Sequence, residues 1–244
     1  MTVSFCLFAI MYYAPLLFQG GFGLSPNQAG ILITPLAVFI TVGSIVNGRI
    51  MMRLQSPKVV LHSGLGFFLI SAMIMTQASM STPHSIIAIA MMLCGLGIGL
   101  ILPNLTLIVQ NSALRKQLGV ATAMLQSIRM IGSMLGTAII GSFITKQYAS
   151  KINNTLDVNN ARELASWLDD PKILFSHEYA GKFMKTMPKL EQDAAFYLSS
   201  AQHSLIEAIH ESQWIISAIV VLTFWLVYHF PAINIHRHSN NSEP

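Results

Sequence analysis

The stretch that decides the fold is GVATAMLQSIRMIGSMLGTAIIG, residues Gly119–Gly141, an apolar run with a single charged side chain, Arg129. A helix rises ~1.5 Å per residue, so Arg129 lies about 15 Å along it, near the middle of a ~30 Å hydrocarbon core. Three further polar residues lie at helical steps on the same face: Gln126, Ser133 and Thr137. We therefore expect a membrane helix whose polar face is turned into a helix bundle.

The composition of the whole chain agrees with a membrane protein. Apolar residues make up 53% of the sequence and charged residues only 10%, whereas soluble domains carry charge at about a quarter of their positions. All ten acidic residues lie at Asp157 or later, so the first two thirds contain no carboxylate side chain. The basic residues form short clusters between apolar runs, a pattern that argues against a nucleic-acid surface.

Apolar runs of membrane-spanning length predict an all-α chain with six transmembrane helices. They are Val3–Phe18, Ala29–Met52, Val59–Ala78, Ile86–Val109, Val120–Ile144 and Trp214–Phe230. The first five occupy residues 1–145, and the last is residues 214–230. The spans can be divided into two three-helix units, an internal symmetry that is typical of secondary transporters.

Basic residues lie in alternate connections between these spans. Arg49, Arg53 and Lys58 flank the turn after the second span, and Arg115 and Lys116 lie in the turn after the fourth. The connections after the first and third spans contain no Lys or Arg. The positive-inside rule places the basic turns in the cytoplasm, together with both termini and the tail at residues 231–244.

The connection at residues 146–213 is long and polar, and we expect it to be an extracytoplasmic loop. It contains nine of the ten acidic residues of the chain. Residues 161–171 and 190–212 have helical spacing, and the second of these segments is predicted to continue into the final span.

Four motifs follow one another along the chain: YYAPLLFQ (Tyr12–Gln19), SPNQAGILITPLA (Ser25–Ala37), GLGIGLILPNLTLIVQN (Gly95–Asn111) and LGVATAMLQSIRMIGSMLGTAIIG (Leu118–Gly141). Together they resemble the C-terminal half of the major facilitator superfamily, specifically the fourteen-span drug:proton antiporters of the EmrB/QacA type. The resemblance covers nearly the whole chain but only the last six helices of that family.

The resemblance implies the C-terminal half of a proton-coupled multidrug exporter in a bacterial inner membrane. Its partners would be the lipid bilayer, a small amphiphilic substrate and a separate N-terminal half that carries the membrane acid. No cofactor is implied. The alternative from a different class is a truncated or non-transporting six-span protein that serves as an interaction module.

Arg129 is the first candidate for the substrate pathway, because a mid-membrane arginine costs ~2.5–3.5 kcal/mol on insertion scales. The alternative interpretation is a structural contact between helices. The first five spans contain no acid, so its partners are expected to be neutral acceptors such as Asn104, Gln126 or helix carbonyls. The same role is considered for the other polar residues of this face and for residues of two further helices: Gln126, Ser133, Thr137, Asn104, Tyr12, Tyr13 and Gln19. An interfacial anchor is an equally good interpretation of the tyrosines.

Three other patterns receive structural interpretations. GLGIG at Gly95–Gly99 lacks the lysine of a phosphate loop and favours close helix packing. His203, Glu207 and His210 share a helical face, which is more typical of a solvated surface than of a zinc site. Ser133 and the last histidine before the tail lie at different depths, so a membrane serine protease is not expected.

Overall fold

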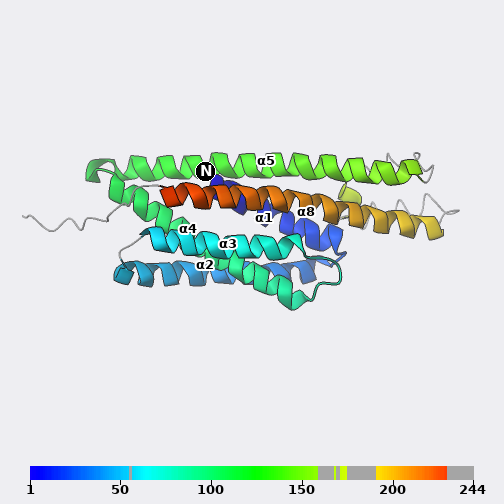
Figure 1. The fold of residues 1–244 in the computed structure, drawn as a ribbon, viewed down its shortest axis with the longest axis horizontal. Helices are drawn as coiled ribbons and strands as arrows, with labels where there is room; N and C mark the ends of the chain where they lie inside the picture. The colour runs from blue at the N-terminus through cyan, green and yellow to red at the C-terminus, as the bar shows by residue number, and fades with distance from the viewer. Residues whose placement is uncertain (55–56, 159–167, 169–170, 175–190, 230–244) are drawn as a thin grey trace, which may run out of the picture.

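The computed structural model describes residues 1–54, 57–158, 168, 171–174 and 191–229, and it is a helix bundle (Figure 1). In chain order its helices are α1 (Thr2–Leu16), α2 (Pro26–Leu54), α3 (Pro57–Thr76), α4 (His84–Ser112), α5 (Leu118–Val158) and α8 (Glu191–His229). A π-helical turn, Leu17–Gly21, continues α1. Within the described ranges, six helices are long and apolar enough to cross a membrane, as the sequence predicted.

The connections alternate between the two ends of the bundle. Figure 1 shows the α2–α3 and α4–α5 connections at one end, where α8 also finishes. The α1–α2 and α3–α4 connections lie at the other end. The basic turns predicted from the sequence therefore share one side of the molecule.

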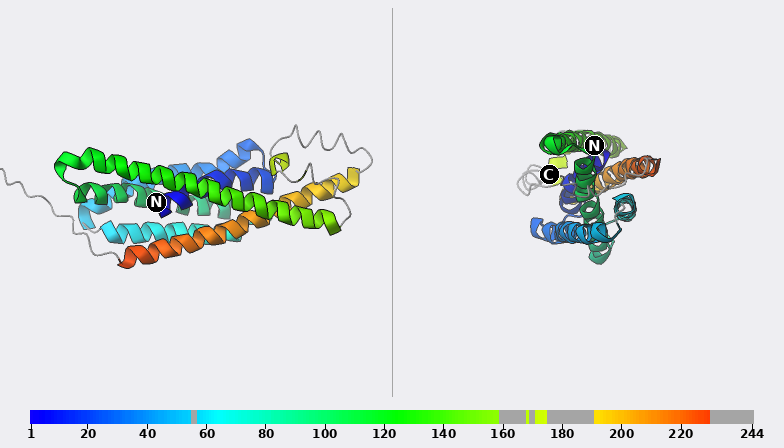
Figure 2. Two further views of the ribbon diagram at one scale, coloured as in Figure 1. Left: turned by 90° about the horizontal axis from the view of Figure 1, so that it is seen from above. Right: turned by 90° about the vertical axis from the view of Figure 1, so that its left-hand side faces the viewer.

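Helix α4 crosses the middle of the bundle and packs between α2 and α3 (Figure 2). Its glycines allow this close approach. A Cβ added at Gly97 would lie 2.7 Å from the carbonyl oxygen of Gly64 in α3. Gly95 and Gly99 face the other way, and a Cβ there would meet the backbone carbonyls of Leu36 and Ile40 in α2. The structure thus assigns the GLGIG stretch to helix packing.

Helix α1 occupies an equivalent position between α5 and α8. Gly132 and Gly136 let its backbone approach α5 closely, because a Cβ at these positions would meet the carbonyl oxygens of Met1 and Phe5. This small-xxx-small spacing is a common membrane-helix contact. The first helix of each predicted three-helix unit, α1 or α4, thus packs between the two later helices of the other unit.

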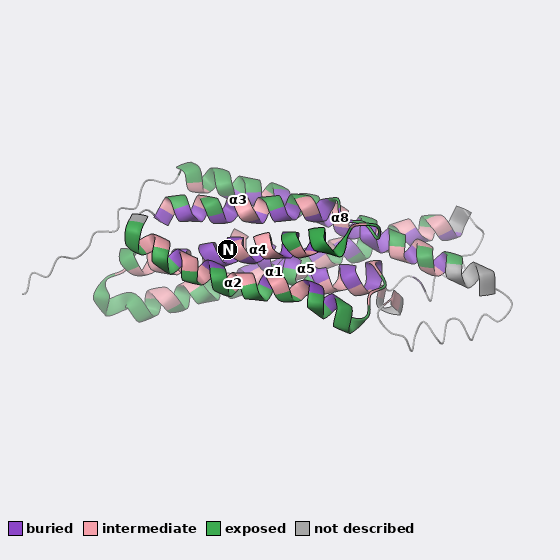
Figure 3. Ribbon diagram, turned by 90° about the horizontal axis from the view of Figure 1, so that it is seen from below, coloured by how far each residue is buried: buried purple, intermediate pink, exposed green. Residues whose placement is uncertain are grey.

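Helices α5 and α8 extend beyond the rest of the bundle, further than the predicted spans. Helix α5 continues past the predicted end at Ile144, and α8 begins at Glu191 because the segment before the last span is continuous with it. Fully buried residues recur along this part of α5 at i+4 spacing: Ile144, Tyr148, Ile152 and Leu156. Figure 3 shows buried positions continuing along both projecting helices. The first external segment, at 161–171, falls mainly outside the described residues.

Candidate functional site

Arg129 lies in the seam between α4 and α5, where neutral groups hold its guanidinium. Its Nη2 donates to the carbonyl oxygen of Leu102 at 2.7 Å and to the hydroxyl of Thr106 at 3.1 Å. Its Nη1 donates to Oε1 of Gln126 at 3.2 Å. The Nε atom is buried and has no partner among the described residues. The side chain is half-buried, and Gln126 is exposed.

The nearest placed carboxylates are far from this guanidinium along the bundle. Glu211 accepts a hydrogen bond from Gln147, which is 18 residues beyond Arg129 on α5. At ~1.5 Å per residue this corresponds to about 27 Å. The charge of Arg129 is therefore solvated by a carbonyl, a hydroxyl and an amide, rather than neutralised by an acid.

Asn104, which was predicted as a partner of Arg129, lies on a different face of α4. It is fully buried, and its Nδ2 donates to the carbonyl oxygen of Pro57 at 2.6 Å, which ties α4 to the start of α3. The partners of Arg129 on α4 are instead Leu102 and Thr106. These two residues are one turn apart on the opposite side of the helix from Asn104.

Proline 103 removes one helical donor from α4, and a neighbouring helix compensates. The carbonyl of Gly99, four residues earlier, loses the N–H that would otherwise bond to it. The Ser44 hydroxyl of α2 lies 3.4 Å from this carbonyl oxygen, but its shorter contact, 2.8 Å, is with the carbonyl oxygen of Ile40 in its own helix. The freed carbonyl therefore faces a polar side chain of α2 at a depth where water is scarce.

Of the three candidates in the first span, one is buried and links two helices, and the other two are more accessible. Tyr13 is buried and donates from its hydroxyl to the carbonyl oxygen of Thr137 at 2.7 Å, which links α1 to α5. Gly141 makes room for that hydroxyl. Tyr12 is 65% exposed, and Gln19 is half-buried in the π-helical turn. Neither Tyr12 nor Gln19 is among the hydrogen-bond partners of Arg129 in the described part of the chain.

The hydroxyls of the two remaining candidates bond within their own helix. Ser133 donates to the carbonyl oxygen of Met130, and Thr137 donates to that of Ser133. His229, which was not expected to pair with Ser133, lies at the end of α8 with its Nδ1 3.1 Å from the carbonyl oxygen of Trp225. The structure does not bring these groups together.

Comparison with known proteins identifies the family. The model of the Major Facilitator Superfamily matches residues 1–137, which is more than half of the chain. The chain belongs to the Major Facilitator Superfamily. The matched residues include α1 to α4 and the part of α5 that carries Arg129, so the described seam lies inside the superfamily region.

Several proteins of known name are similar to this superfamily member. The multidrug transporter protein MdtP of Bacillus subtilis is 26% identical over 155 residues, which cover 63% of this chain and 28% of the relative. The methylenomycin A resistance protein of Streptomyces coelicolor is 30% identical over 141 residues, or 57% of this chain and 29% of the relative. The tetracycline resistance determinant of Streptomyces rimosus is 27% identical over 172 residues, or 70% and 49%. The matching segment thus spans less than half of each of these relatives.

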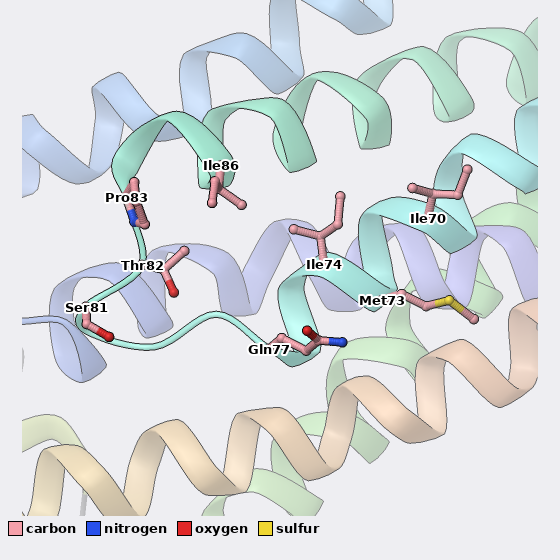
Figure 4. Close-up of a pocket in the computed structure, with 8 residues that line it drawn as sticks. All are labelled: Ile70, Met73, Ile74, Gln77, Ser81, Thr82, Pro83 and Ile86. Atoms are coloured by element: carbon pink, nitrogen blue, oxygen red, sulfur yellow. The ribbon is translucent and has the colours of Figure 1, made fainter.

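Two clefts of this superfamily member lie away from the seam. One, of about 550 Å³, is formed by the end of α3, the following loop and the start of α4, and Figure 4 shows its apolar wall and polar mouth. The other, of about 530 Å³, lies between the projecting parts of α5 and α8. At its edge Lys151 forms ion pairs with Glu207 at 2.8 Å and Glu211 at 3.0 Å. Glu207, considered above with two histidines, is thus engaged by a lysine.

Proposed function

We propose that this chain is the C-terminal half of a proton-coupled drug exporter of the fourteen-span EmrB/QacA type. It would act with an N-terminal half, and the two would move small amphiphilic compounds across the membrane. The observation that carries the proposal is the half-buried guanidinium of Arg129, which lies at mid-span with only neutral acceptors. Ionisable residues at this depth usually mark a substrate or ion route.

The named relatives support the proposal that the transporter exports its substrates and that these substrates are drugs. Their names describe multidrug transport and resistance to methylenomycin A or tetracycline. Because the matching segments cover less than half of each relative, we infer that the remaining helices of the carrier belong to an N-terminal half. Two bundles that rock about a site at the membrane midplane are the general arrangement of such carriers.

The candidate residues take two kinds of role in this proposal. Arg129 and Gln126 line the pathway, and the exposed ring of Tyr12 offers a surface for flat or cationic compounds through stacking and cation–π contact. Gln19 contributes to the outer end of the same pathway. A second group stabilises the helices that line the pathway through hydrogen bonds between and within helices: Tyr13, Asn104, Ser133 and Thr137.

We place the basic end of the bundle in the cytoplasm of a bacterial inner membrane. Both termini and residues 231–244 then lie inside, and residues 146–213 project outside. The alternate basic connections support this orientation, since they share one end in Figure 1.

The test is efflux by a transporter assembled from this chain and an N-terminal half, expressed in a strain that lacks its own drug pumps. We expect Arg129→Ala to reduce ethidium efflux at least about tenfold, while Arg129→Lys retains more activity because it keeps the charge. Arg115→Ala, in the exposed turn before α5, is the matched control and should leave efflux unchanged. Unchanged efflux in Arg129→Ala, with normal protein levels, would overturn the pathway role.

A further inference from the structure

A polar stripe runs along α8 where that helix packs against the rest of the bundle. His210, Gln213 and Ser217 follow one another at steps of three and four, so they share one helical face. Gln213 is 5% exposed and Ser217 is 6% exposed. Gln213 Oε1, Ser217 Oγ and His210 Nε2 are all buried and have no hydrogen-bond partner within the described part of the chain.

The stripe has a defined boundary at each end. At the outer end, the ring of His210 lies within hydrogen-bonding reach of the backbone of Ala78, just after α3. Towards the other end, Val220 is buried and the ring of Phe224 packs edge-on against His62 of α3, with centroids 5.0 Å apart. The stripe therefore begins beside the external connection and ends at an apolar contact.

Three unpartnered polar atoms on one buried face require an explanation. An unsatisfied buried polar group costs ~1–3 kcal/mol, and native proteins satisfy such groups with ordered water when protein partners are missing. A buried water needs two to four polar partners. From His210 to Ser217 the stripe spans eight residues, or about 10 Å of helix, and it supplies three such atoms within that length.

We propose that His210, Gln213 and Ser217 form a hydrated proton-binding site inside the bundle, open toward the extracytoplasmic end of α8. Water bridges the three unpartnered atoms, and His210 takes up the proton. Imidazole is the side chain suited to this role, because its charge changes between about pH 5 and 8. The resulting imidazolium donates to the bridging water, and Gln213 Oε1 accepts from that water.

Three charged side chains lie near His210 among the described residues. On α8 these are Glu207 and Glu211, and on α5 it is Lys151, which forms ion pairs with both carboxylates. From the end of α3, the contact is the backbone of Ala78. The two acids are thus engaged with a lysine, and the imidazole of His210 is the remaining titratable side chain at this end of the stripe.

The role of this site in transport rests on the proposed function. In a proton-coupled exporter, a site that binds a proton at the outer face is suited to the inward-moving proton. The binding of water and a proton does not require transport, so it can be measured on the 244-residue chain alone.

The first experiment measures hydration by water-edited solid-state NMR of the labelled chain in phosphatidylcholine vesicles. We expect magnetisation transfer from water to the side chains of Gln213 and Ser217. Ser71 is the internal control, since it is equally buried but donates to the carbonyl oxygen of Ala90 at 2.6 Å. Transfer to Gln213 and Ser217 no faster than transfer to Ser71 would overturn the proposal.

The second experiment follows the titration of His210, whose signal is assigned by its loss in His210→Asn. We expect reversible protonation, with a midpoint that Gln213→Leu lowers by about one pH unit, because the imidazolium loses its hydrated acceptor. Gln213→Glu should raise the midpoint, and it provides a polar variant if the leucine does not fold. Gln202→Leu, two turns earlier on α8, is the control and should leave the midpoint unchanged.

A midpoint that is the same in wild type, Gln213→Leu and Gln213→Glu would overturn the assignment, as would a His210 that does not titrate. These outcomes are independent of the export proposal. If His210 titrates as expected but the chain and an N-terminal half together export no drug, only the proposed function is contradicted. If they export drug but Gln213 and Ser217 receive no magnetisation from water, only the proton site is contradicted.

Discussion

Substitution of Gly97 by alanine tests whether the glycines of α4 set the separation of the helices. The added Cβ would lie 2.7 Å from the Gly64 carbonyl oxygen and 2.9 Å from the Phe68 amide nitrogen, both of which are backbone atoms of α3. Ordinary contact begins near 3.4 Å, so α3 and α4 must separate by about 0.7 Å. Overpacking of this kind costs ~1–3 kcal/mol.

Gly66→Ala supplies the matched control for this change. Gly66 also lies within a membrane helix, but its added Cβ would meet no atom within 4 Å. Both substitutions gain the same intrinsic helix preference of ~0.5–1 kcal/mol. The difference between the two variants therefore isolates the packing cost, and Gly97→Ala should be less stable than Gly66→Ala by ~1–3 kcal/mol.

The assay is reversible unfolding of the purified chain in mixed micelles, with the free energy of unfolding extracted for wild type and both variants. The apparent slope of the transition should be unchanged, so that the shift reports stability alone. Equal free energies of unfolding for the two variants would refute the close α3–α4 contact.

Two further substitutions test contacts along α5. Tyr13→Phe removes the hydrogen bond to the Thr137 carbonyl and should lower the free energy of unfolding by ~0.5–1.5 kcal/mol; no loss in the same micelle assay would show that this bond does not hold α1 to α5. Lys151→Met breaks the ion pairs with Glu207 and Glu211, but both acids are partly exposed. Its effect should stay below ~1 kcal/mol and shrink in high salt, whereas Lys146→Met, at an exposed position on the same helix, should show no salt dependence. A salt-independent loss in Lys151→Met would argue against an electrostatic role.

Much of the fold could be predicted from the sequence, because hydropathy determines where helices cross a membrane. The six spans and the shared side of the basic turns follow from apolar runs and the positions of Lys and Arg. The extension of α5 was missed because residues 145–158 are mostly polar. The i+4 recurrence of Ile144, Tyr148, Ile152 and Leu156 was the available signal for a packed helix there.

The chemical type of the partners of Arg129 could be predicted from the sequence, but not all of the residues that supply them. The lack of acids before Asp157 indicated neutral partners, and the structure provides Gln126 and a helix carbonyl. Asn104 was named as a partner and Thr106 was not considered, because periodicity defines the faces of α4 without showing which neighbouring helix each face contacts. That assignment depends on the tertiary packing of α4 between α2 and α3, which places Asn104 against Pro57.

Reconstitution of this chain as the sole protein component of proteoliposomes tests the central claim most directly. With a pH gradient and a fluorescent amphiphilic dye, the chain alone should give no sustained efflux, because in the proposed function it supplies one bundle of a two-bundle carrier. Addition of an N-terminal half should restore efflux that Arg129→Ala abolishes. Sustained, gradient-driven efflux by the chain alone would contradict the account.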